Sequence, residues 1–249
     1  MSTARDVPEI LPASPDVLAA AAEAGIAFDD GDLEKLHGYL VQLYETNARM
    51  NLTAVKDPVE AWTKHVLDSL TLLPWLNAAM ESGEKLRVLD VGSGGGCPGI
   101  PLACVLPDVR FTLLESTGKK ARFLESTVEV LGLKNVDVVA DRAENAAHDP
   151  AHRAGYQLVL SRAVGRLPVL LELTVPFAVE GGLVLSIKGA QAQAEIAEAR
   201  QALHMLHSTV VDVVENPTGR VVVVEKCRKT PKAYPRSPGE PGRKPLGTS

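Results

Sequence analysis

The chain has 249 residues, of which 45% are hydrophobic, enough for one large domain with a substantial core and some appendages. No apolar run approaches the roughly 18 residues of a membrane span, and residues 1–15 carry acids and prolines where a signal peptide needs a basic and then an apolar stretch. The three cysteines have no metal-like spacing, so we expect reduced thiols in a cytoplasmic protein without a metal and without membrane contact.

The first 85 residues predict an N-terminal helical extension. Ser14-Pro15 is a typical helix start, and a run rich in alanine follows it before Gly25. Leucines recur at helical spacing over residues 32–45, and apolar residues do so again over residues 58–76. We interpret both stripes as core positions of two further helices.

From Leu86 onward, strand and helix patterns alternate, which predicts a parallel sheet covered on both faces. A helix then precedes two strands that the turn Asn216-Pro217-Thr218-Gly219 joins as an antiparallel pair. Five parallel strands closed by such a hairpin predict an α/β fold, the Rossmann-like doubly wound sheet of class I S-adenosylmethionine (SAM) methyltransferases with one antiparallel strand. The expected strands are 86–91, 109–114, 136–140, 157–161, 181–187, 208–214 and 220–226, and the expected helices are 98–106, 117–131, 168–178 and 192–206.

The charge of −5 is unevenly distributed, because residues 226–249 carry seven basic side chains and one acidic side chain. Five prolines in residues 229–249 argue against a helix or a central strand, so we expect an extended basic arm. Clustered basic residues indicate a polyanion partner, although a solubilising tail explains them equally well. The expected organisation is a helical extension at 1–85, a SAM-dependent methyltransferase domain at 86–226 and the C-terminal arm at 227–249.

Residues 88–99 contain the most informative motif, Val-Leu-Asp-Val-Gly-Ser-Gly-Gly-Gly-Cys-Pro-Gly. An apolar strand ends in Asp90, and a cluster that includes Gly92, Gly94 and Gly96 leads into a helix, so a nucleotide-like group should lie against this turn. Such a turn alone serves dinucleotide and SAM enzymes alike. Asp90 can bind the turn's amides and the methionine ammonium of SAM, and a dehydrogenase would lack the closing hairpin. Both observations favour SAM, and the absence of a Walker-type Gly-Lys-Ser/Thr argues against triphosphate chemistry.

Candidate ligand contacts follow the next three strands. Glu115 ends the second strand, where a carboxylate can accept hydrogen bonds from both ribose hydroxyls. After the third strand, the backbone at Ala143 and Glu144 can contact adenine. Arg162 ends the fourth strand, where a methyl acceptor enters, and arginine there suits a ligand or a phosphate. The structural alternatives are a helix N-terminal acid for Glu115 and a surface arginine for Arg162.

Two signatures of other methyltransferases are missing from the sequence. Residues 161–163, Ser-Arg-Ala, stand where enzymes that methylate exocyclic amines often carry Asp/Asn-Pro-Pro-aromatic, and no cysteine fits the nucleophile of pyrimidine-carbon enzymes. These absences favour an acceptor that needs neither covalent catalysis nor deprotonation, such as guanine N7. The enzyme would then act mainly by positioning and electrostatics.

Further motifs extend over nearly the whole chain. They are Asn51-Leu-Thr53, His65-Val-Leu-Asp-Ser-Leu70, Asp90 through Leu102, Lys119-Lys120-x-x-Phe123-Leu124, Arg142-Ala-Glu144, Ser161-Arg-Ala-Val164, Lys188-Gly189, and Tyr234-Pro-Arg236 through Pro245-Leu246. On these motifs the chain resembles the bacterial small-subunit ribosomal RNA guanine-N7 methyltransferases, also called glucose-inhibited division protein B. The resemblance implies methylation of a guanine N7 in the decoding-region loop of 16S ribosomal RNA (rRNA) with SAM as cofactor and S-adenosylhomocysteine as product, by direct transfer without a covalent intermediate.

The motifs and the resemblance together assign residues to three roles. The cofactor contacts are Asp90, Gly92, Gly94, Gly96, Cys97, Glu115, Ala143, Glu144 and Arg162, and the catalytic residues are Arg162 and Ser161. The RNA contacts are Asn51, His65, Asp68, Lys188, Arg236, Arg243 and Lys244. Taken alone, Asn51 is interpreted as a helix cap and His65 as a packing residue. The expected partner is 16S rRNA or the small ribosomal subunit, and we expect a monomer.

Two other functions are compatible with these residues. One is an RNA-binding or ribosome-assembly factor that has lost catalysis, against which the intact glycine turn and Glu115 argue. The other is a small-molecule methyltransferase, for which the basic arm would be only a solvated tail.

Overall fold

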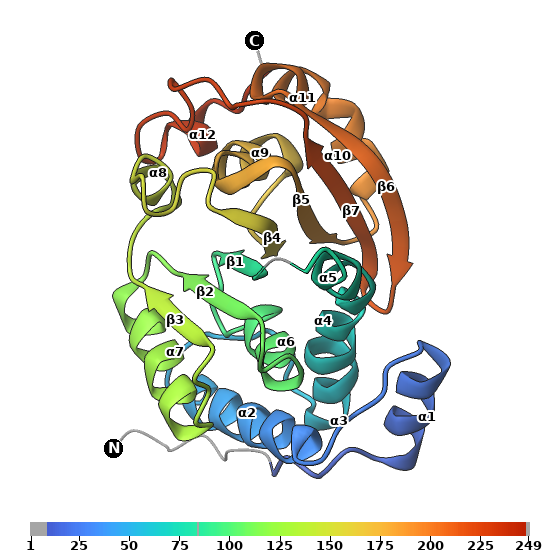
Figure 1. Ribbon diagram of the computed structural model, residues 1–249. Helices are drawn as coiled ribbons and strands as arrows, with labels where there is room; N and C mark the ends of the chain where they lie inside the picture. The colour runs from blue at the N-terminus through green and yellow to red at the C-terminus, as the bar shows by residue number, and fades with distance from the viewer. Residues whose placement is uncertain (1–8, 84, 248–249) are drawn as a thin grey trace.

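The computed structural model describes residues 9–83 and 85–247, and its centre is a seven-stranded sheet in the order β3-β2-β1-β4-β5-β7-β6 (Figure 1). The strands are β1 (Arg87–Val91), β2 (Arg110–Leu114), β3 (Val136–Val139), β4 (Tyr156–Arg162), β5 (Ala178–Lys188), β6 (Ser208–Asn216) and β7 (Gly219–Lys226). Among these strands, β7 alone is antiparallel to its neighbours β5 and β6. The predicted fold class is confirmed. Residues 1–8 and 248–249 of the expected extension and arm lie outside the described residues.

Both faces of the sheet are buried at its central strands, whereas the edge strand β6 is largely exposed. Successive side chains of a strand point to opposite faces, and in β7 Val221 and Val223 join one hydrophobic cluster whereas Val222 and Val224 join a second one. The first cluster also contains the apolar stripes of the N-terminal helices. Residues 9–83 therefore form a layer of the same core, on the side of the sheet that also carries α6 and α7 (Figure 1).

The helices on this side are more divided than the sequence predicts. The helix expected over 58–76 breaks after Leu70 and restarts at Leu73, because Pro74 removes a backbone N–H and clashes with the preceding turn. The elements are α1 (Pro15–Glu23), α2 (Asp32–Asn47), α3 (Pro58–Ala61), the π-helical η1 (Trp62–Leu67), α4 (Asp68–Leu70), α5 (Leu73–Met80), α6 (Gly99–Val105) and α7 (Gly118–Val130). Across the described ranges, no helix combines the length and the apolarity that crossing a bilayer requires.

The other face of the sheet carries shorter helices and the C-terminal segment. These elements are α8 (Ala143–Ala146), α9 (Leu167–Thr174), the 3₁₀ turn η2 (Val175–Phe177), α10 (Ala192–Glu198), α11 (Arg200–Leu206) and α12 (Glu240–Arg243). The single helix expected over 192–206 is two helices, since Ala199 takes a turn conformation with φ −80° and ψ −3°.

The expectation of an extended arm without a helix is wrong. Pro241 occupies the first turn of α12, where its missing N–H costs nothing. Both Pro241 and Leu246 are buried, and Leu246 belongs to the second hydrophobic cluster. The C-terminal segment is therefore packed onto the domain, above α8 and α9 in Figure 1.

One buried amide joins two connections at the edge where the parallel strands begin. The side-chain nitrogen of Asn135 lies 3.0 to 3.2 Å from the carbonyl oxygens of Ala103, Leu106 and Val109. Asn135 is 6% exposed, so these carbonyls have little access to water. The contact holds the connection between α6 and β2 against the start of β3.

We expect Asn135→Ala to lower the free energy of unfolding by about 1–3 kcal/mol, because it leaves buried carbonyl groups without a donor. Urea unfolding monitored by circular dichroism measures this change. The exposed Asn77 of α5 provides the control, and Asn77→Ala should change the free energy by less than about 0.5 kcal/mol. Equal effects of the two substitutions would contradict the assigned role of Asn135.

Candidate active site

The turn after β1 requires glycine at three positions. Gly92, Gly94 and Gly96 have φ of 73°, 55° and 97°, a region that other residues rarely adopt. Gly92 and Gly94 line a cavity. Gly96 has a packing role instead, since a Cβ there would lie 2.6 Å from Cδ1 of Ile100.

Asp90 lies beneath this turn with a fully buried carboxyl group. Its Oδ2 accepts a hydrogen bond from the Gly99 N–H at 3.2 Å, while Oδ1 has no partner among the described residues. Burial raises the pKa of Asp90 to about 7. Asp90 thus supports the turn from below and lines neither this cavity nor the second one described below.

Glu115 connects the turn to the end of β2. Its Oε2 accepts from the Gly94 N–H at 3.0 Å and its Oε1 accepts from the Thr117 N–H at 2.7 Å. A carboxylate offers about four lone-pair positions, so each oxygen can still accept from a ligand hydroxyl. The residue is 5% exposed, which fixes the carboxylate in one orientation.

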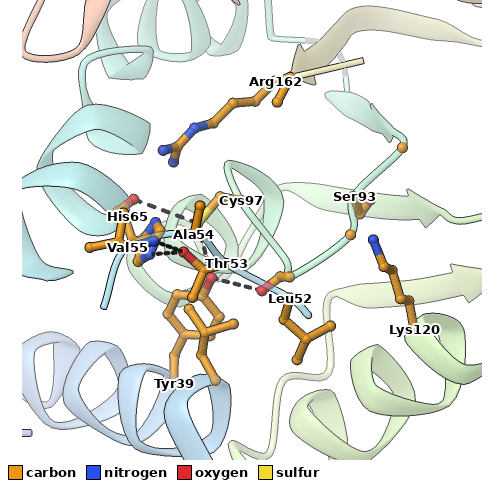
Figure 2. A pocket seen from close by; sticks show the side chains of 15 residues that line it. Tyr39, Leu52, Thr53, Ala54, Val55, His65, Ser93, Cys97, Lys120 and Arg162 are labelled. Atoms are coloured by element: carbon orange, nitrogen blue, oxygen red, sulfur yellow. Dashed lines mark hydrogen bonds between the residues drawn. The ribbon is translucent and has the colours of Figure 1, made fainter. Parts of the chain in front are cut away.

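A cavity of about 330 Å³ opens above the turn (Figure 2). Its walls come from α2, the loop of residues 52–55, the glycine turn and the end of β4. Figure 2 shows the side chain of Arg162 reaching across it toward His65, with Lys120 on the opposite side near Ser93. None of the described residues that line this cavity is acidic, so its two cationic side chains favour an anionic group.

Most of the cavity wall that the N-terminal layer supplies was not predicted from the sequence. The Tyr39 hydroxyl donates to the Gly95 carbonyl at 2.8 Å and lies 2.9 Å from Cys97 Sγ. The Thr53 Oγ1 lies 2.9 Å from His65 Nε2. Only the Asn51-Leu-Thr53 motif signalled this loop, and nothing in the pattern of α2 separated Tyr39 from ordinary core residues.

The side chain of Asn47, and not that of Asn51, holds the backbone of this loop. The Asn47 Oδ1 accepts from the N–H groups of Leu52 and Thr53, at 2.8 and 3.0 Å. Asn51 itself is exposed and lines neither cavity. The interpretation of Asn51 as a helix cap is wrong, because the next helix, α3, has Asp57 as its N-cap.

Asp68 forms an ion pair with Arg162. The Arg162 Nη1 lies 3.5 Å from Asp68 Oδ2, and Asp68 Oδ1 accepts from Asn216 Nδ2 at 2.8 Å and Thr218 Oγ1 at 2.5 Å. Burial raises the pKa of Asp68. This side chain is fully buried, and it joins α4, the β6–β7 turn and the end of β4.

A second cavity of about 140 Å³ lies beside the first and shares Gly92 with it. Ala143, Glu144, Val164 and Leu173 are among its lining residues. Glu144 accepts hydrogen bonds there, and although burial opposes ionisation, the donors from the backbone and Arg142 lower its pKa. Glu115 lines neither cavity, but its neighbours Leu114 and Ser116 line the smaller one, and its carboxylate accepts from Gly94, which lines the larger one.

Several predicted site residues lie away from both cavities. The buried Ser161 Oγ lies 3.1 Å from Ser186 Oγ, between β4 and β5. Lys188 is 8% exposed and pairs with Glu195 at 2.7 Å. Arg243 and Lys244 are exposed on the C-terminal segment, and Arg236 pairs with the buried Glu172 at 2.7 Å.

Comparison with known proteins decides the family. The family model of GidB, rRNA small subunit methyltransferase G, matches residues 32–223. A ribosomal RNA small subunit methyltransferase G of Sorangium cellulosum is 47% identical over 214 residues, which cover 86% of this chain and 88% of the relative. One of Desulfitobacterium hafniense is 41% identical over 227 residues, covering 89% and 92%. The chain belongs to the rRNA small subunit methyltransferase G family.

Solved structures with low sequence identity share the fold. A putative O-methyltransferase from Klebsiella pneumoniae superimposes with a TM-score of 0.53 at 16% identity, over 86% of this chain and 97% of that one. The E81Q mutant of MtNAS, solved in complex with S-adenosylmethionine, superimposes with a TM-score of 0.50 at 15% identity, over 86% and 76%. Family membership thus rests on the sequence relatives, and these structures support the fold.

Asp90 and His65 respond to pH in opposite directions. Burial, with the charge of Arg162, lowers the pKa of His65 to about 4, whereas that of Asp90 is raised to about 7. Asp90 thus contributes stability that is present below about pH 4 and lost as the pH rises to about 7. His65 contributes stability that is present above about pH 6.5 and lost as the pH falls to about 4. The two contributions offset each other in this window.

Single substitutions should separate the contributions of Asp90 and His65 to stability. Each pKa unit between the folded and unfolded states corresponds to about 1.4 kcal/mol of unfolding free energy. When the pH is lowered from 7 to 4, the unfolding free energy of Asp90→Asn should fall by about 4 kcal/mol relative to that of the wild type. The unfolding free energy of His65→Asn should rise by about 3 kcal/mol relative to that of the wild type over the same change. Denaturant unfolding of the protein without cofactor at several pH values measures both. The exposed Asp108→Asn serves as the control. Wild-type pH profiles in both variants would contradict the prediction.

Proposed function

We propose that this protein transfers a methyl group from SAM to N7 of a guanine in the decoding-region loop of 16S rRNA. The observation that carries the proposal is the pair of cavities that share Gly92, with Glu115 bonded to the glycine turn and Arg162 lining the larger cavity, in a chain of this family. One cavity suits a nucleoside, and the other suits an amino-acid group together with an incoming base.

The residues fit SAM on several independent points. The Glu115 carboxylate is oriented by two backbone donors and keeps lone pairs for the ribose hydroxyls. Ala143 and Glu144 line the smaller cavity where adenine would lie. The Arg162 guanidinium lines the larger cavity while its Nη1 faces Asp68 at 3.5 Å, and it would bind the methionine carboxylate or an RNA phosphate. When bound, SAM supplies an electrophilic methyl group on a positively charged sulfur.

The acceptor end lacks an ionised nucleophile or base among its described cavity-lining residues. Burial raises the pKa of Cys97, so its thiol stays protonated and is a poor nucleophile. The pKa of His65 is lowered to about 4, so its neutral imidazole is a weak base at physiological pH. Guanine N7 presents a lone pair and needs no deprotonation. The cavity therefore has to orient the base, which favours direct transfer without a covalent intermediate.

Ribosomal RNA from cells with and without this gene tests the function. Mass spectrometry of nuclease fragments should find one 7-methylguanosine in the decoding-region loop of 16S rRNA that is missing without the gene. Restoration by the wild-type gene is the control. An unchanged methylation pattern would contradict the proposal, and it would favour a factor without catalysis or a small-molecule methyltransferase.

Arg162→Ala should lower turnover more than SAM affinity. We expect kcat at saturating SAM and RNA to fall on the order of 100-fold, since loss of an orienting group misplaces the reactants. Calorimetry should show a smaller loss of SAM affinity. Arg166→Ala is the matched control, because Arg166 lies on the next loop, pairs with Glu198 and lines neither cavity. Wild-type turnover in Arg162→Ala would contradict this role.

The exposed cations of the C-terminal segment should supply RNA affinity without selecting the base. Arg243 and Lys244 are available for phosphates, whereas the guanidinium of Arg236 is already paired. Replacing Arg243 and Lys244 with alanine should reduce the salt slope of log affinity by about 0.7–0.9 for each phosphate that is no longer neutralised, with the methylated position unchanged. Alanine at the exposed Lys85 and Lys134 is the control pair. A wild-type slope in the first variant would show that Arg243 and Lys244 do not neutralise RNA phosphates.

A further inference from the structure

Residues 230–246, which we call the C-terminal brace, are attached to the domain by several polar contacts. The guanidinium of Arg153 donates to the Ala147 carbonyl at 2.8 Å and to the Tyr234 carbonyl at 2.9 Å, and so bridges the end of α8 and the brace. The His148 Nε2 lies 2.8 Å from the Pro235 carbonyl. Together with the burial of Leu246, these contacts hold the brace on the outer side of α8 and α9.

The strongest contact of the brace is an ion pair. Arg236 donates to the carboxylate of Glu172 from its backbone N–H at 2.8 Å, from Nε at 2.9 Å and from Nη2 at 2.7 Å. Glu172 has no exposed surface, so this carboxylate depends on Arg236 for its charge partner. Arg236 also donates to the Lys244 carbonyl at 2.7 Å, which closes the brace upon itself.

A second contact reaches the cofactor region. The Gly239 N–H donates to Glu144 Oε1 at 2.7 Å, and Glu144 lines the smaller cavity. Leu173 lines the same cavity and directly follows Glu172, the partner of Arg236. The brace thus contacts one wall residue of the proposed adenosine cavity, Glu144 on α8, and the chain neighbour of a second one, Leu173 on α9.

We propose that the C-terminal brace positions the adenosine wall of the cofactor site, with Arg236 and Gly239 as positioning residues. This inference rests on the proposed function, because it assigns that cavity to the adenosine of SAM. α8 has only four residues and cannot maintain its orientation alone. The brace supplies the missing constraint, so cofactor affinity depends on residues that do not touch the cofactor. In this arrangement Arg236 binds the carboxylate of Glu172 within the protein, and the exposed cations of the brace bind RNA phosphates.

The test uses a mild backbone change and its matched control. Gly239 has φ +81° with nothing within 4 Å of an added Cβ, so Gly239→Ala strains the backbone at the contact with Glu144 without a clash. Gly25 has φ +72° and equally open space, but it lies between α1 and α2 on the other face of the sheet. Gly25→Ala therefore matches the strain without touching the brace.

The measurements are SAM affinity by calorimetry and amide exchange of residues 143–147 by mass spectrometry, on the full chain. Gly239→Ala and Arg236→Gln should raise the Kd for SAM by about 2- to 30-fold, the range expected for contacts that act on a site through one neighbour. Exchange at 143–147 should become faster in both. Gly25→Ala should keep the wild-type Kd at a similar loss of Tm. If Arg236→Gln does not fold, Gly239→Ala still decides the outcome.

Wild-type SAM affinity in Gly239→Ala would overturn the inference, even if exchange at 143–147 were faster. An equal loss of SAM affinity in Gly25→Ala would overturn it too, since the effect would then follow general destabilisation. Both results leave the proposed function standing, because the wild-type protein binds SAM in each case. A wild-type protein that bound no SAM would overturn the proposed function and the inference together.

Discussion

The two hydrogen bonds to the carboxylate of Glu115 determine the form of the candidate site. One comes from Gly94 in the turn after β1 and the other from Thr117 at the start of α7, so a single side chain fixes two neighbouring strand ends. The two cavities share Gly92, and Gly94, one of the two residues that donate to Glu115, lines the larger one. Asp90 supports the same turn from below through Gly99. A ligand that spans both cavities therefore meets a surface that is already organised, which lowers the cost of ordering it.

The sheet and the nucleotide side of the site could be predicted because local signals and global fold agree there. Each of the three signals lies within a few residues of sequence: the period-two burial of a strand such as β7, the glycine turn, and the acid after β2. The wall from the N-terminal layer was missed because it depends on tertiary contacts. Tyr39 has the spacing of an ordinary core residue, and only the folded chain brings its hydroxyl to Cys97, 58 positions away.

The C-terminal segment shows the reverse case, in which a correct local observation led to a wrong expectation. Its prolines do prevent a long helix, but they allow one turn, α12, and a chain that packs closely. Charge counting treated Arg236 as free, because its partner Glu172 is 64 positions earlier and lies on an apolar helix. Which basic residues face solvent follows from such long-range pairs, and composition does not contain that information.

The shared core of the N-terminal helices and the sheet has a consequence for synthesis on the ribosome. The helices emerge first, yet their apolar side chains Leu36, Leu40 and Leu43 pack in the same cluster as strand residues from Val88 to Val223. Until those strands have been translated, this leucine surface has no permanent partner and is open to chaperones, proteases and aggregation. Since β7 is inserted between β5 and β6, the sheet is completed only when nearly the whole chain has been made. Completion of the sheet is thus delayed to the end of translation by its strand order.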